Sequence, residues 1–214
     1  MQFSSVNISF EAKAFLRDLW KRHKDYTAVN QELRSICGIM DFFEAEGDFD
    51  ELRRFLVDEQ SSVREADRTE YGDFQTNLNL ANRIASFLKA EGIAPEVLVE
   101  PTFGKGNFIL AALQHFPQLR QISGVEIYKP YVWEAKFAVF DFFLKNPGHP
   151  KPDIRLFHQD VFDFDFQKLS REMSGEILIL GNPPWVTNAK LGALNSANLP
   201  AKSNFKNLNG LDAM

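Results

Sequence analysis

The chain has 214 residues, of which 44% are hydrophobic and 25% are charged, and its formal net charge is −5. This is the composition of an ordinary globular protein, and no apolar run approaches the roughly 18 residues that a membrane-spanning helix needs. A single cysteine excludes an internal disulfide and a cysteine-rich zinc site. The first ten residues lack the basic start and apolar stretch of a signal peptide, so we expect a cytoplasmic protein.

The negative charge is concentrated at one end of the chain. Residues 1–70 carry 10 basic and 15 acidic side chains, whereas residues 71–214 carry 14 of each. Nucleic-acid-binding domains normally carry a basic surface. Neither range is basic, so the charge distribution by itself argues against a nucleic-acid-binding surface on this chain.

The N-terminal third of the chain is predicted to be helical. Ser9 is a candidate N-cap for a helix whose apolar side chains over 15–20 share one face. Apolar residues recur at helical spacing over 29–43, and Gly47 breaks the pattern. A third, shorter helix is expected around 52–56. Cys37 falls on the apolar face of the second helix and is expected to be a small core residue.

From residue 71 the pattern becomes one of alternating helices and strands. A helical stripe covers 78–88 and closes near Gly92. Short apolar runs predict strands over 97–100, 122–127, 154–157 and 177–180, with helices over 107–116 and 131–144 and another before the last strand. This alternation predicts an α/β fold with a parallel sheet and crossover helices.

The sequence thus divides into three expected parts. These are a helical extension over 1–70, an α/β core over 71–189 and a loop-like tail over 190–214 that is rich in Asn, Ser, Ala and Lys. A doubly wound sheet usually has more than four strands. We therefore expect the sheet to be incomplete and the chain to be a fragment, either the product of a truncated gene or the first part of a longer protein.

The first chemically informative segment follows the strand over 97–100. Glu100 ends this strand, and Gly104 and Gly106 then lead into a helix. Glycines at these positions would let a ligand approach the backbone closely at the start of the helix. A tight turn without a ligand is the alternative interpretation, and the pattern alone does not decide between them.

Acidic residues also end the next two strands. Glu126 lies at the end of the second strand, 26 positions after Glu100, much as an acidic residue follows a nucleotide loop and binds ribose hydroxyls. Asp160 follows the third strand and precedes Val161 and Phe162. This group is suited to hold an exocyclic amine and to pack on an adenine ring.

The histidines carry less information. His158 lies at the end of the third strand and is expected to be a structural residue. His23, His115 and His149 have no ligand-like spacing, so no metal site is predicted.

The strongest signal is Asn182-Pro183-Pro184-Trp185, which directly follows the fourth strand. Two prolines cannot continue a strand and impose a stiff, extended turn. The side-chain oxygen of Asn182 and the carbonyl of Pro183 would then be two fixed acceptors for a planar NH₂ group, and Trp185 offers a stacking face. A proline-terminated strand with a buried tryptophan is the structural alternative.

Together these segments resemble motifs of S-adenosylmethionine-dependent amino-methyltransferases. Residues 182–185 are similar to the (Asn/Asp/Ser)-Pro-Pro-(Tyr/Phe/Trp) motif of that family. Residues 100–108 look like the first motif of N6-adenine DNA methyltransferases, and residues 71–76 resemble the segment that precedes it in the gamma order. The resemblance implies a Rossmann-like class I methyltransferase fold with an all-α N-terminal extension.

The resemblance also implies a role for each matching residue. Thr76 and the loop over 100–106 would hold the methionine half of the cofactor, Glu126 the ribose, and Asp160 the adenine amine. The implied cofactor-binding set is Phe74, Thr76, Glu100, Pro101, Gly104, Gly106, Asn107, Glu126, Ile127, Asp160, Val161 and Phe162. The implied catalytic set is Asn182, Pro183, Pro184 and Trp185.

The implied reaction is transfer of the sulfonium methyl group to the N6 amine of adenine in DNA, without a metal, in a restriction–modification or related system. Only 29 residues follow Trp185, too few for the target-recognition domain of that family. We therefore expect the basic DNA-reading surface in a missing part. DNA binding and turnover by the isolated chain stay open at this point, and the N-terminal helices are a candidate docking surface for a partner subunit.

Three other functions stay open at this point. Glutamine methyltransferases of release factors and guanine-N2 methyltransferases of ribosomal RNA also act on planar NH₂ groups, and a non-catalytic cofactor-binding fragment is a third reading. Pro101 after the acidic residue, and Trp185 where the glutamine enzymes usually have Tyr, favour the DNA enzyme.

Overall fold

The computed structural model describes residues 3, 6–57 and 75–183. Contacts divide the chain into two compact units, one of residues 1–64 and 76–182 and one of residues 65–75 and 183–214. Only residues 75 and 183 of the second unit are described, so the fold below is that of the first. None of the helices in the described ranges has the length and apolarity to cross a membrane.

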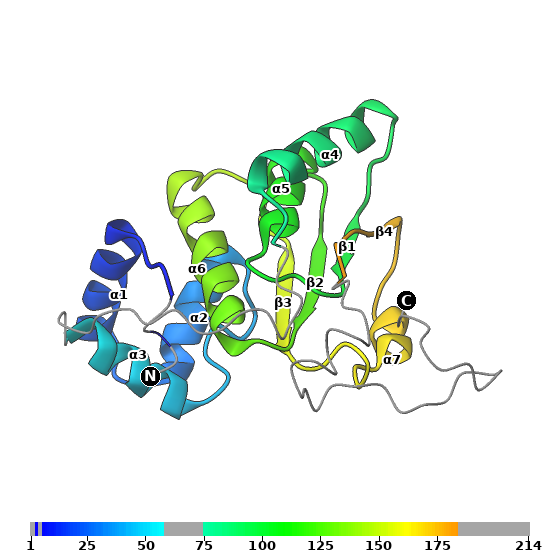
Figure 1. Ribbon diagram of the computed structural model, residues 1–214. Coiled ribbons are helices and arrows are strands. Elements are labelled where there is room, and N and C mark those ends of the chain that lie inside the picture. The colour runs from blue at the N-terminus through cyan, green and yellow to red at the C-terminus, as the bar shows by residue number, and fades with distance from the viewer. Residues whose placement is uncertain (1–2, 4–5, 58–74, 184–214) are drawn as a thin grey trace, which may run out of the picture. The chain divides into compact units, whose positions relative to one another are not determined.

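Four parallel strands form a single sheet in the order β3-β2-β1-β4 (Figure 1). The strands are β1 (Val97–Glu100), β2 (Gln121–Glu126), β3 (Asp153–His158) and β4 (Ile177–Ile179). This is the order of the first four strands of a doubly wound nucleotide-binding sheet. The predicted α/β fold with a Rossmann-like parallel sheet is confirmed.

The helices are of two groups that meet at α6. The first group comprises α1 (Phe10–Arg22), α2 (Tyr26–Cys37) and α3 (Glu46–Val57), and the second comprises α4 (Leu78–Ala90), α5 (Asn107–His115), α6 (Lys129–Lys145) and α7 (Phe166–Arg171). Helices α5 and α6 pack on the sheet, α4 packs on α5, and α1 and α2 pack on α6 (Figure 1). The predicted all-α extension is therefore present, and it shares a core with the sheet.

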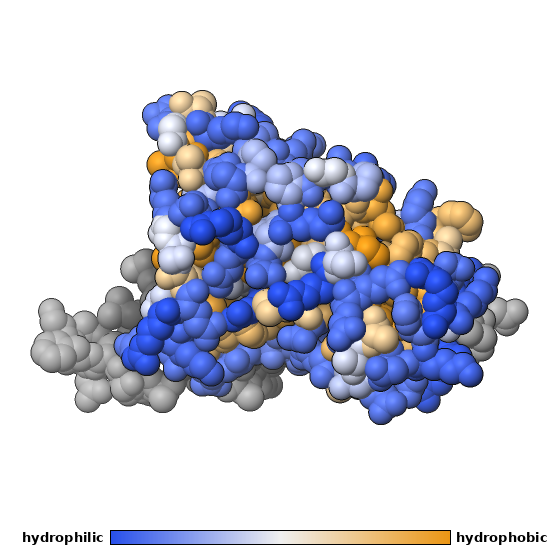
Figure 2. All heavy atoms as spheres, turned by 180° about the vertical axis from the view of Figure 1, so that it is seen from behind, coloured by the Kyte–Doolittle hydropathy of each residue, from blue (hydrophilic) through white to orange (hydrophobic). Residues whose placement is uncertain are grey.

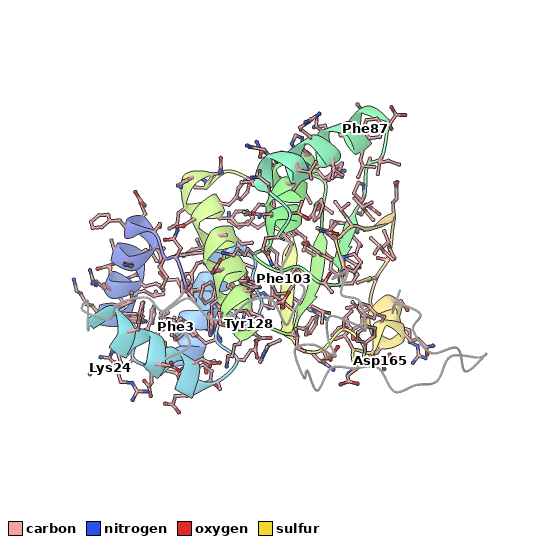
Figure 3. The ribbon with its side chains drawn as sticks, viewed as in Figure 1. Phe3, Lys24, Phe87, Phe103, Tyr128 and Asp165 are labelled. Atoms are coloured by element: carbon pink, nitrogen blue, oxygen red, sulfur yellow. The ribbon has the colours of Figure 1, made fainter. Side chains whose placement is uncertain are left out.

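Helix α6 is apolar on nearly all sides because it lies between the sheet and the N-terminal helices. Trp133, Phe137 and Phe140 are each at most 1% exposed, as expected of a helix that is covered all round. Phe3 lies before α1 (Figure 3), and its ring centroid is 4.8 Å from that of Trp133. Aromatic packing around α6 gives a structural reason for much of the chain's high content of 21 phenylalanines.

The start of α1 confirms the cap that was predicted from the sequence. The hydroxyl oxygen of Ser9 accepts a hydrogen bond from the N–H of Ala12 at 3.0 Å. The same hydroxyl donates to Asp141 of α6 at 2.6 Å. The cap residue of α1 thus also joins the N-terminal helices to the core.

The predicted extent of the second helix is wrong. Helix α2 ends at Cys37, because Gly38 takes the left-handed conformation with φ of 74°. A Cβ atom at this position would overlap the carbonyl oxygen of Pro152. After Gly38 the chain runs beside β3, where Ile39 forms a parallel bridge with Ile154.

Gly47 does not break a helix either, since it lies inside α3. Cys37 is fully buried, as expected of a core residue. Burial raises the pKa of its thiol to about 12, so it stays neutral and unreactive.

The surface seen from behind is mainly hydrophilic, with apolar side chains visible in small areas (Figure 2). The large apolar side chains that are exposed among the described residues include Phe87, Phe162 and Ile179. Ile179 lies on β4, which pairs with β1 and has no second partner strand in the described ranges. Among the residues that the structure describes, this side of β4 is therefore an unpaired edge of the sheet.

Candidate functional site

The described candidate residues lie where the strands end. Glu100 is the last residue of β1 and Glu126 the last of β2, Asp160 follows β3, and Asn182 follows β4. Because all four strands are parallel, their carboxyl ends share one edge of the sheet. Ligands of open α/β sheets bind at that edge. The topology thus brings four predicted site residues to one edge.

The loop after β1 is fixed by backbone hydrogen bonds. The N–H of Phe103 donates to the carbonyl of Val125 at 3.1 Å, and the N–H of Gly106 donates to the carbonyl of Phe103 at 2.8 Å. Phe103 belongs to this loop and Tyr128 to the turn after β2 (Figure 3). The loop therefore keeps a defined position against the end of β2.

Glycine is needed at positions 104 and 106 for different structural reasons. Both have positive φ, 53° at Gly104 and 79° at Gly106, a region that other residues rarely adopt. A Cβ at Gly106 would lie 2.9 Å from the Cβ of Ala135, so this glycine is required where α5 starts against α6. Gly104 instead presents its N–H to the carboxylate of Glu126.

Glu126 ties this loop to the turn after β2. Its Oε2 accepts from the N–H of Gly104 at 2.9 Å, and its Oε1 accepts from the N–H of Tyr128 at 2.8 Å. Backbone donors of this kind stabilise a carboxylate charge. The side chain of Glu126 is therefore held in a defined position, half-buried at the end of β2.

Glu100 is in a very different environment. It is 2% exposed, and its Oε2 is buried without a hydrogen-bond partner. Burial raises the pKa of Glu100 well above its ordinary value of 4.5, the N–H of Ile109 in the first turn of α5 lowers it in part, and the negative charge of Glu126 raises it further. A buried acceptor without a partner needs an explanation, and a ligand that supplies the missing donor is one such explanation.

Thr76 connects two of the other predicted residues. Its carbonyl accepts from the amide of Asn107, the first residue of α5, at 2.7 Å. Its hydroxyl oxygen accepts from the amide of Asn182 at 3.3 Å. Thr76 therefore lies between the glycine loop's helix and the segment after β4. Gly181 packs on the same edge, since a Cβ there would lie 3.7 Å from the Cγ of Glu100.

The turn after β3 exposes an apolar ring beside an acidic residue. Asp160 accepts from the N–H of Phe162 at 2.9 Å, and the Phe162 side chain is 91% exposed. Ile127, in the neighbouring turn, is 42% exposed, and Val161 is half-buried. His158 donates its Nε2–H to the carbonyl of Ile127 at 3.0 Å, which agrees with the structural role expected for it.

Some predicted residues lie outside the described ranges. These are Phe74, Pro184 and Trp185. Pro101 lies in the glycine loop and is half-buried, and Pro183 is exposed.

The sequence interpretation also missed residues of this loop. Thr102 has a buried hydroxyl oxygen without a partner. Lys105 forms an ion pair with Glu134 of α6 at 2.9 Å and lies over the ring of Tyr131. A hydroxyl residue inside the motif was the available signal for Thr102. The Lys105 pair depends on how the loop packs on α6 and had no signal in the sequence.

The chain was compared with protein families, with solved structures and with curated proteins. No protein-family model matches the chain. Two solved structures resemble it weakly, a protein of Pyrococcus horikoshii designated as an RNA methyltransferase and the rRNA methyltransferase AviRa of Streptomyces viridochromogenes. The match to the first has a TM-score of 0.39 at 20% sequence identity and covers 56% of this chain and 52% of the Pyrococcus chain. The match to the second has a TM-score of 0.36 at 17% sequence identity and covers 66% of this chain and 75% of the AviRa chain. Likenesses at this level do not bear on the substrate.

A curated relative matches far more closely. The type II methyltransferase M.NspV of Nostoc sp. is 43% identical over 150 residues, which are 70% of this chain and 30% of the relative. The chain thus spans less than a third of that protein's length. The relative confirms the resemblance to methyltransferases that the motifs indicated.

Proposed function

We propose that this chain carries the cofactor site and methyl-acceptor motif of a methyltransferase that acts on the N6 amine of adenine in DNA, within a restriction–modification or related system. The observation that carries the proposal is the convergence of Glu100, Glu126, Asp160 and Asn182 at one edge of the sheet. The curated relative, a type II methyltransferase, supports the same class of reaction.

The residues present fit S-adenosylmethionine. The buried oxygens of Glu100 and Thr102 lack hydrogen-bond partners, and the cofactor's methionine end has an ammonium group that can donate to such acceptors. Glu126, which two backbone amides hold at the end of β2, would bind the ribose hydroxyls. Asp160 would accept from the adenine amine, while the exposed ring of Phe162, with Val161 and Ile127, would pack on the base.

The methyl-acceptor motif would act mainly by positioning. Bound S-adenosylmethionine supplies an electrophilic methyl group on its sulfonium. The Asn182 side-chain oxygen and the Pro183 carbonyl would accept the two hydrogens of a planar amine and so localise the nitrogen lone pair. The hydrogen bond to Thr76 orients the Asn182 side chain. Correct placement of two reacting atoms accounts for a large part of the acceleration in such transfers.

DNA is favoured over the other planar NH₂ substrates by two residues. Pro101 follows the acidic Glu100, and the motif after β4 ends in Trp185. An adenine within a duplex must leave the base stack to reach such a site, and Trp185 would stack on the flipped base.

Transfer of a labelled methyl group tests this proposal. The chain is incubated with tritiated S-adenosylmethionine and, separately, unmethylated DNA, ribosomal RNA and release-factor protein, and the labelled product is identified by mass spectrometry. We expect N6-methyladenine in DNA, abolished by Asn182→Ala and kept by Asn146→Ala at the far end of α6. Label only in RNA or protein would identify one of the other substrates. Cofactor binding without any transfer would indicate a non-catalytic fragment.

A further inference from the structure

Two carboxyl groups end neighbouring strands at the proposed cofactor site, and the fold treats them in opposite ways. Glu126, half-buried at the end of β2, accepts from two backbone amides. Glu100, paired with Gly124 in the register of β1 and β2, is 2% exposed and has one oxygen without any donor. Unequal environments of this kind separate the protonation states of paired carboxyl groups.

The groups around Glu100 do little to stabilise a negative charge on its carboxylate, which would be the second one beside that of Glu126. Helix α5 contributes the N–H of Ile109, and β2 contributes the negative charge of Glu126. On the β4 side the neighbour is Gly181, and residues 177–183 contain no charged side chain. The nearest cation in sequence, Lys105, is engaged by Glu134 at 2.9 Å. Within the described part of the chain, the one charged side chain that acts on Glu100 is therefore another carboxylate.

We propose that Glu100 carries a proton in the free protein and releases it when the cationic methionine end of S-adenosylmethionine binds. The O–H bond of the carboxyl group breaks, its electron pair stays on Glu100, and the proton passes to the buffer. The inference rests on the proposed function, because it takes S-adenosylmethionine as the ligand.

The reason for release is electrostatic. A neutral carboxyl group avoids a second buried negative charge beside Glu126. The ammonium group of the ligand brings both a hydrogen-bond donor for the orphan oxygen and a positive charge that favours the ionised form. The ammonium group brings one positive charge into the site, and the proton of Glu100 takes one away. The buried region therefore gains an ion pair without a change in net charge.

Calorimetric titration of the whole chain with S-adenosylmethionine measures the release. At one pH, the observed enthalpy in buffers of different ionisation enthalpy gives the number of protons released per ligand. We expect net release for the wild type and none for Glu100→Gln, whose neutral amide resembles the protonated side chain. The matched variant Glu91→Gln, at an exposed position after α4, should release protons as the wild type does.

Two further readouts identify the trigger. The wild-type affinity should rise with pH, by at most about tenfold per pH unit for one released proton, whereas that of Glu100→Gln should stay level. S-adenosylhomocysteine, which keeps the ammonium group, should cause release. 5′-Methylthioadenosine, which lacks the methionine end, should bind without release.

The outcomes separate this inference from the proposed function. Equal wild-type enthalpies in all buffers would overturn the proton release and leave the cofactor site standing. Absence of any binding by a folded wild-type chain would overturn both. If circular dichroism shows that Glu100→Gln does not fold, infrared difference spectra of the wild type decide. Loss of a neutral carboxyl C=O band on ligand addition supports the release, and an unchanged band contradicts it.

Discussion

At the scale of single residues, the properties of the two glutamates at the site are set by their surroundings. Glu100 and Glu126 are chemically the same and end adjacent strands, but one has a buried oxygen without a donor and the other accepts from two amides. Their positions could be predicted from the sequence, because acidic residues followed two apolar runs. Their environments could not, because burial and the N–H of Ile109 depend on how α5 packs.

The raised pKa of Glu100 predicts a pH dependence of stability in the free protein. Between the ordinary value of 4.5 and the raised pKa, the folded state binds more protons than the unfolded state. The free energy of unfolding therefore falls as pH rises through this window. Glu100→Gln should remove that decline and be more stable than the wild type at the upper end. Urea titrations across the pH series check this, and parallel profiles of the two proteins would contradict it.

Other site contacts join residues that are distant in the sequence. The Asn182 amide reaches the hydroxyl of Thr76, 106 positions away. A pattern of short motifs predicts that both residues belong to the site, since each adjoins a strand or helix end. It gives no means of predicting that they touch, because the contact depends on the order β1-β4 in the sheet.

At the scale of elements, apolar runs and helical periodicity predicted all four strands and most helices within a few residues. The third helix, expected around 52–56, begins earlier, at Glu46, and the second helix is a more informative exception. The pattern over 29–43 continued at helical spacing, yet α2 ends at Cys37. Phe42 and Phe43 are buried by contacts with α6 and α3 rather than by a shared helical face. Periodicity cannot distinguish these two reasons for burial.

Gly38 at the end of α2 predicts a large effect of a single methyl group. Gly38→Ala should be destabilising, because it adds about 1 kcal/mol of left-handed strain and a further cost of about 1–3 kcal/mol from overlap with the Pro152 carbonyl. Gly92→Ala is the matched control. Gly92 also has positive φ, at 85°, but a Cβ there meets nothing within 4 Å. Urea unfolding measures both variants, and equal losses of stability would contradict the assigned contact.

At the scale of the whole described unit, the N-terminal helices and the sheet are held together through α6. Lys136 of α6 is 1% exposed and donates to the carbonyls of Asp41 and Phe42 at 3.1 and 3.0 Å. Burial lowers the pKa of this lysine, and Glu44 partly offsets that effect. A charged residue in the core could not be predicted from a hydrophobic pattern. It places the loop between α2 and α3 against α6.

Phe42 tests whether this shared core unfolds as one. Its ring packs on Phe43, Trp133, Phe137 and Phe140. Phe42→Ala should lower the free energy of unfolding by about 3–5 kcal/mol, and tryptophan fluorescence and far-ultraviolet circular dichroism should still report one transition. Phe10→Ala, at a side chain that is 78% exposed, should have little effect. Separate transitions for helices and sheet would show that the extension folds independently.

The most direct test of the cofactor site is calorimetric titration of the wild-type chain and Glu126→Ala with S-adenosylmethionine. Glu126 fixes the glycine loop through Gly104 and is assigned to the ribose hydroxyls, and hydrogen bonds to a charged group are each worth about 1.5–3 kcal/mol. We expect the wild type to bind and the variant to bind at least about tenfold more weakly. A folded wild-type chain that does not bind, or a variant that binds equally well, would contradict the assignment of this edge of the sheet as the cofactor site.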